Sequence, residues 1–244
     1  MHLKQALLTL LLCPFLAFAK APQEDIQNIR FLAFNSSSHL LLHYNPVTSS
    51  ANPEHAEKYR ADMQQLNMLL QQTPSPELQA EGARLQSLIE TLEQHRGDEA
   101  HLYPIWINPI LESQARLDSL AQQLDPESDH DSSPLQTLDR LMLNSQRLLL
   151  YYQTRAFGSL AVYIDDLKQG APETLDQAIR QDLATLQQML PQQATELSKL
   201  ERSYNYIRRH LLQQTGEFVP GSVAYYLEQI GLQSQQIAEQ LRQS

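Results

Sequence analysis

Apolar residues recur every three or four positions along most of the chain, which is the spacing that places them on one face of an α-helix. Prolines divide this pattern into segments of helix length. Asn52 and Pro53 suit the cap and the first position of a helix, because the cap side chain accepts a backbone hydrogen bond and proline needs no amide hydrogen there. From this start the helical period continues through Tyr59, Met63, Leu66, Leu69 and Leu70.

The first half of the chain is predicted to contain four such helices. The first covers 25–44 and ends before Pro46, because the residue that precedes a proline avoids the α conformation. The second begins at Pro53, and the proline-rich segment 73–76 ends it and starts the third. A loop over 97–104 leads to the fourth helix, which ends near Leu124.

The second half follows the same plan with one difference. Its first helix can extend from Leu135 to Lys168 and is then longer than its counterpart, although Gly158 is a position at which it would bend or break. Pro172 opens the next helix, Pro191 separates or kinks the two helices that follow, and a loop over 216–221 precedes the last.

Short segments of the first half recur in the same order in the second half. Asp62 and Leu66 correspond to Asp182 and Leu186 at a shift of 120 residues. Chance similarity between two stretches rich in Leu and Gln could produce any single match, but an ordered series at a nearly constant shift favours duplication. We therefore predict a tandem duplication of two up-down four-helix bundles, with repeat A over 25–124, an acidic linker over 125–133 and repeat B over 134–241.

The composition indicates an all-α fold. The 244 residues include 43 Leu and 31 Gln, which form helices readily, but only 7 Gly, the residue that the turns of all-β folds need. The formal net charge is −10. Nucleic-acid-binding proteins are normally basic, and an anionic membrane surface repels an acidic protein, so neither is an expected partner.

The N-terminal residues 1–19 have the features of a secretory signal peptide. Lys4 precedes an apolar run over 6–18, and Ala17 and Ala19 form a typical cleavage signal. An uncleaved anchor and a lipoprotein are the alternatives, but spanning a bilayer takes about 20 residues, and Cys13 does not follow the small residues of a lipid-attachment site. Cleavage would remove this single cysteine, so we expect a cysteine-free periplasmic or secreted protein with no integral membrane span.

Motifs for catalysis and cofactor binding are not found in the sequence, so we predict no catalytic residue, no metal site and no cofactor. His39 and His43 have the i,i+4 spacing of metal ligands, but surface or interface histidines are the favoured interpretation without a third ligand. The acidic residues of 125–133 are interpreted as a solvated linker rather than a calcium site, and the other Asp and Glu residues are expected on polar helix faces. Haem held by His and Met stays open, because such ligation leaves little sequence trace.

One polar stripe in repeat B is the candidate binding site. Arg147, Tyr151 and Arg155 follow one another at steps of four, which places them on one helix face. Arginine binds carboxylates and phosphates, and tyrosine adds a flat contact. As a binding site, this stripe requires Tyr204 and Arg208 from a later helix to converge with it on one cavity. The alternative is that these side chains cover the rim of a wide core.

Two functions are compatible with these patterns. The first is a non-enzymatic interaction or adaptor module of the bacterial cell envelope, which binds another envelope protein or a second copy of itself through helix faces. The alternative is a periplasmic protein that binds or senses a small anionic ligand through the stripe of repeat B.

Overall fold

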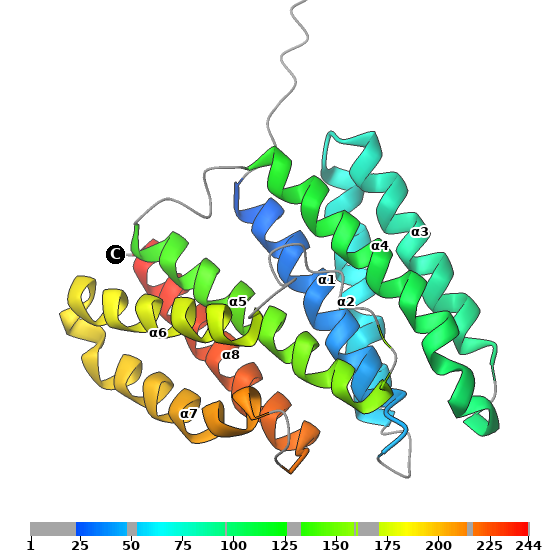
Figure 1. Ribbon diagram of the computed structural model, residues 1–244. Helices are drawn as coiled ribbons and strands as arrows, with labels where there is room; N and C mark the ends of the chain where they lie inside the picture. The colour runs from blue at the N-terminus through cyan, green and yellow to red at the C-terminus, as the bar shows by residue number, and fades with distance from the viewer. Residues whose placement is uncertain are drawn as a thin grey trace, which may run out of the picture.

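The computed structural model describes residues 23–47, 53–95, 97–125, 133–158, 160, 171–213 and 217–243. Over these residues the chain forms eight α-helices and no β-strand, which confirms the predicted all-α class. None of the described helices combines the length and the hydropathy that crossing a membrane requires. The helices are α1 (Gln23–His43), α2 (Pro53–Gln72), α3 (Pro76–Glu93), α4 (Tyr103–Leu124), α5 (Pro134–Thr154), α6 (Ala171–Met189), α7 (Ala194–Leu212) and α8 (Pro220–Gln243) (Figure 1).

Prolines and serine caps determine several helix starts. The hydroxyl of Ser75 accepts a hydrogen bond from the amide of Leu78 at 3.3 Å, and α3 begins directly after it. The hydroxyl of Ser133 does the same for the amide of Gln136 at the start of α5. Pro53 is the first residue of α2, as its position in the sequence predicts.

α1 and α5 lie at the centre of the molecule and pack against each other (Figure 1). In the first half, α1 also packs against α2 and α4, and α3 contacts both of these helices. In the second half, α5 packs against α6 and α8, and α7 contacts both of these. The two halves therefore have the same pattern of neighbouring helices, and they meet along α1 and α5.

Apolar side chains from both halves form one continuous core. Leu66 of α2 and Leu186 of α6, which correspond in the sequence comparison, are both fully buried. The central helices are buried on several faces because each packs against three other helices. Polar side chains are buried with them, and Ser36, for example, satisfies its hydroxyl by donating to the carbonyl oxygen of Ala33 at 3.2 Å.

The first helix of the second half does not continue through Gly158, and the bend or break expected at this glycine is confirmed. α5 ends at Thr154 and is followed by a short 3₁₀ helix, Arg155–Phe157, and then by Gly158 with a φ of 63°. Glycine adopts a positive φ at low cost, and this conformation takes the chain off the helical path. Residues 161–170 lie outside the described residues.

Two further predicted segments fall largely outside the described residues, namely the signal peptide over 1–19 and most of the acidic linker. Asp125, which was expected in a solvated linker, is only 3 % exposed and accepts a hydrogen bond from the amide of Gln27 at 3.3 Å. The predicted loop over 97–104 contains a short 3₁₀ helix, Gly97–Leu102, and the first two residues of α4.

Candidate functional site

The five residues of the predicted stripe occupy three different places. Arg147 is buried between the halves, where its Nη2 lies 3.0 Å from Oδ2 of Asp118 on α4. Oδ1 of the same carboxylate lies 2.6 Å from Nε of Arg30 on α1, and Arg30 is fully buried. Arg147 therefore takes part in an ion-pair network that joins α1, α4 and α5, rather than in a cavity.

Tyr204 and Arg208 share a partner inside the second half. The hydroxyl of Tyr204 donates to Oδ1 of Asp176 at 2.9 Å. The guanidinium of Arg208 binds both oxygens of this carboxylate, with Nε–Oδ1 at 2.6 Å and Nη2–Oδ2 at 2.8 Å. These contacts link α7 to α6. They also compensate the negative charge of Asp176, which is only 4 % exposed.

Tyr151 and Arg155 are the two stripe residues that the structure brings together at a cavity. They line a pocket of about 580 Å³ at the C-terminal end of α5. The guanidinium of Arg155 lies 4.9 Å from the ring centre of Tyr152 and 5.8 Å from that of Phe218, and its Nη1 donates to the carbonyl oxygen of His210 at 3.3 Å. Apolar side chains form much of the remaining wall, including Leu160, Leu211 and Leu212.

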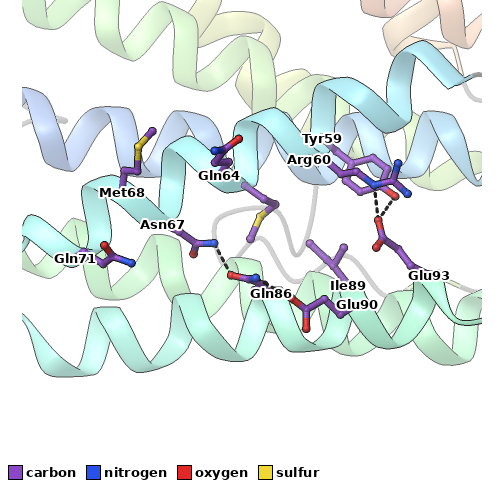
Figure 2. A pocket seen from close by; sticks show the side chains of 11 residues that line it. Tyr59, Arg60, Gln64, Asn67, Met68, Gln71, Gln86, Ile89, Glu90 and Glu93 are labelled. Carbon is purple, nitrogen blue, oxygen red and sulfur yellow. Dashed lines mark hydrogen bonds and ion pairs between the residues drawn. The ribbon is translucent and has the colours of Figure 1, made fainter.

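A second hollow, the α2–α3 groove, lies between α2 and α3 in the first half (Figure 2). Its volume is about 350 Å³. Three buried side chains, Tyr59, Met63 and Ile89, give it an apolar floor, while Met68 is 51 % exposed. The remaining lining residues are polar or charged: Arg60, Gln64, Asn67, Gln71, Gln86, Glu90 and Glu93.

Hydrogen bonds organise the polar residues of the α2–α3 groove. Nδ2 of Asn67 donates to Oε1 of Gln86 across the groove, and Nε2 of Gln86 donates to Oε1 of Glu90 at 2.7 Å (Figure 2). At the end formed by the start of α2, Glu93 accepts from the hydroxyl of Tyr59 at 2.6 Å and from Nε of Arg60 at 2.8 Å. Burial opposes ionisation of Glu93, but these two hydrogen bonds bring its pKa below its ordinary value.

A cluster of titratable side chains, which we call the histidine cluster, joins the two halves at another place. It consists of His39 on α1, His55 and Lys58 on α2, and Glu228 on α8. Nδ1 of His39 lies 3.2 Å from Nδ1 of His55, and Nζ of Lys58 lies 3.0 Å from Oε2 of Glu228. Burial, together with the charges of His55 and Lys58, lowers the pKa of His39 to about 3, so this imidazole is neutral beside Glu228 at neutral pH.

His39 and His43, whose i,i+4 spacing was noted but interpreted as that of surface or interface histidines, have different surroundings. His39 is 2 % exposed and bonds to His55, while the ring of His43 packs against the rings of Tyr44 and Tyr59. Within the part of the chain that the structure describes, no group of three His, Cys, Asp or Glu residues is arranged to hold a metal ion.

The sequence analysis did not identify the α2–α3 groove. One signal for it is present in the sequence: Gln64, Met68 and Gln71 occupy one exposed face of α2 at steps of four and three, so a large apolar side chain lies among amides on a surface. The other four lining residues come from α3, and a single sequence does not show which face of α3 lies opposite. Comparisons of the chain with protein-family models, with curated proteins and with solved structures found no match.

Proposed function

We propose that this protein is a non-enzymatic interaction module that binds a segment of another polypeptide chain in the α2–α3 groove. The observation that carries this proposal is the combination of an apolar floor, an exposed methionine and a rim of amide side chains in one open hollow. Methionine adapts its shape to different partners, and amides offer both donors and acceptors to a polypeptide. Concave surfaces of this kind are the usual sites of recognition.

We also propose that the module acts in the bacterial cell envelope, in the periplasm or after secretion. The support for export is the apolar run over 6–18 and the cleavage signal over 17–19, which overlaps the end of this run. The partner is accordingly another envelope protein or a second copy of this chain.

A tandem duplication of two four-helix bundles is the third part of the proposal. The order of helix contacts in α1–α4 repeats in α5–α8, which supports it. The contacts between halves also correspond: Arg147 of α5 reaches Asp118 of α4, and His39 of α1 lies 3.7 Å from Glu228 of α8. Each central helix thus contacts the fourth helix of the other half through polar side chains, as a gene duplication would produce.

The docking proposal is tested by placing a photo-reactive amino acid at Met68 and, as a control, at the exposed Gln236 of α8, in cells that produce the protein. We expect illumination to give one or a few discrete protein adducts at position 68 that are missing at position 236. Adding Gln86→Leu, which removes an amide of the groove, should weaken these adducts. Identical adducts at both positions, or none at position 68, would contradict docking in the groove.

The pocket at the end of α5 supports a second candidate function, the binding of a small anion with an apolar body. Its volume lies in the usual range of ligand sites, its walls are largely apolar, and Tyr151 and Arg155 supply a hydroxyl and a positive charge. A panel of aliphatic and aromatic carboxylates is screened by the rise in melting temperature. We expect a hit on the wild type to be lost in Arg155→Gln and kept in Arg209→Gln, a control on the exposed face of α7. A hit that Arg155→Gln leaves unchanged would exclude this site.

A further inference from the structure

We infer that the partner segment in the α2–α3 groove is an extended peptide that carries one apolar anchor residue beside a basic group. This inference rests on the proposed docking function and names the chemistry of its occupant. The evidence is a set of four amides, one apolar recess and one carboxylate. Each of the three features indicates a different property of the ligand.

The amides favour an extended backbone over a helix. Gln64, Asn67, Gln71 and Gln86 line the groove from both helices (Figure 2). An extended peptide exposes an amide hydrogen and a carbonyl oxygen at every residue, and these groups need partners when they leave water. A docked helix has already satisfied its backbone groups internally, so four amides would contribute little to its binding.

The hydrogen bond between Asn67 and Gln86 can be replaced by hydrogen bonds to a peptide at a small cost in free energy. It is an amide–amide hydrogen bond across the groove, on exposed side chains. A peptide group that enters between them replaces one hydrogen bond of this type by others of the same type, so the number of satisfied groups is preserved. The groove can therefore open to a backbone without leaving a buried polar atom unpaired.

The floor of the groove accommodates a single anchor side chain. Met63 and Ile89 are 6 % and 5 % exposed, and Tyr59 is fully buried beside them. The volume of about 350 Å³ is at the low end for ligand sites, which suits a few residues and not the face of a helix. An amphipathic helix needs a continuous apolar strip, whereas Met68 is flanked by Gln64 and Gln71 on this face.

Charge selects a basic group at one end. Arg60 and Glu93 neutralise each other at a distance of 2.8 Å. Glu90 accepts from the neutral amide of Gln86 and pairs with no cation among the described residues. The groove therefore has one carboxylate in excess, and the chain as a whole has a formal net charge of −10. A Lys or Arg side chain or a peptide N-terminus complements Glu90.

The test uses a phage-displayed library of random seven-residue peptides, panned on the purified full chain. Selected peptides are then synthesised, and their affinities are measured by fluorescence polarisation. We expect the selected set to share an apolar residue next to Lys or Arg. Gln86→Leu should weaken binding about tenfold or more, because an unpaired peptide group at a contact costs that much. The matched control is Gln187→Leu, which removes the corresponding interhelical contact of α6 with Glu201 on α7 and should leave affinity unchanged.

Two further measurements separate the peptide chemistry from docking itself. Glu90→Gln should remove the preference for the basic residue, and methylation of single backbone nitrogens of the peptide should weaken binding at alternate positions, as an extended chain requires. Peptides that become helical on binding, that are acidic, or that ignore Gln86→Leu would overturn the inference, as would a library with no selected sequence. If crosslinking at position 68 still gave discrete adducts, docking in the groove would stand without it; if crosslinking failed as well, both would fall.

Discussion

Buried carboxylates are the feature of single residues that departs most from sequence-based expectation. Asp118, Asp176 and Asp182 are 7 %, 4 % and 3 % exposed, although carboxylates were expected on polar helix faces. Each is compensated by an arginine of another helix, and Nη2 of Arg140 lies 2.6 Å from Oδ1 of Asp182. Helical spacing assigns a residue to a face of its own helix, but it does not show which cation lies opposite. These carboxylates were therefore not predictable from spacing, whereas the buried Leu66 was.

Asp62 is expected to make the folded protein less stable as the pH rises. Burial, reinforced by the charge of Glu228, raises its pKa to about 7, although the amide of Asn35 at 2.8 Å and Lys58 act in the opposite direction. A carboxyl whose pKa is higher in the folded than in the unfolded state binds its proton more tightly when folded. Its contribution to stability is present below pH 4 and is lost as the pH rises from about 4 to about 7.

The variant Asp62→Asn removes this titration while keeping an amide that Asn35 can bond. Urea unfolding at pH 4.5 and at pH 8 compares it with the wild type. Relative to the wild type, the variant should gain about 1–2 kcal/mol between the two pH values, less than the full shift implies because Asp62 keeps some contact with water. His39, His55 and the other groups titrate in both proteins and cancel in the difference. An equal difference at both pH values would contradict a raised pKa.

Helix starts were predictable to within a few residues, as were the ends of α1 and α4, but the end of α5 was not. Pro53, Pro172 and Pro220 lie at or next to the first residues of α2, α6 and α8, because proline restricts the chain locally. The end of α5 depends on contacts that are distant in sequence. The hydroxyl of Tyr152 accepts a hydrogen bond from the amide of Val219 at 2.8 Å, and its ring stacks on Phe218. These contacts fix the end of α5 against the segment before α8, close to the point where Gly158 changes the direction of the chain. The spacing of apolar residues within one helix does not predict them.

Contacts between residues distant in sequence also explain why only two of the five stripe residues line a common pocket. Arg147 and Tyr151 lie on α5, whereas Arg155 belongs to the 3₁₀ helix that follows it. The central helix passes first through the interface of the halves and then ends at the surface, so Arg147 is 8 % exposed while Arg155 lines a pocket. Position along a helix therefore decided the role of each residue, and it depends on the packing of the other half.

At the scale of the whole molecule, the network of Arg30, Asp118 and Arg147 is a deeply buried ionic link between the described parts of the two halves. One carboxylate of α4 contacts two guanidinium groups, one from each central helix. Removal of the shared anion and removal of one cation should therefore have unequal effects. Loss of Asp118 leaves two positive charges in a buried place, whereas loss of Arg147 leaves the pair of Arg30 and Asp118, whose Nε–Oδ1 distance is 2.6 Å.

We expect Asp118→Ala to destabilise the protein by about 3–5 kcal/mol, and Arg147→Met, which exchanges the cation–π contact with Phe34 for an apolar side chain of similar length, to change stability by about 1 kcal/mol or less. Urea unfolding is followed by circular dichroism and by the fluorescence of Trp106, the single tryptophan, which lies in the first half on α4.

In Asp118→Ala the two signals should change at different urea concentrations, because the halves no longer unfold as one unit. Asp182→Ala breaks an ion pair within the second half and leaves the packing of α1 against α5 in place, so the two signals should change together. Equal losses for Asp118→Ala and Arg147→Met would show that the shared carboxylate does not organise the contact between the halves.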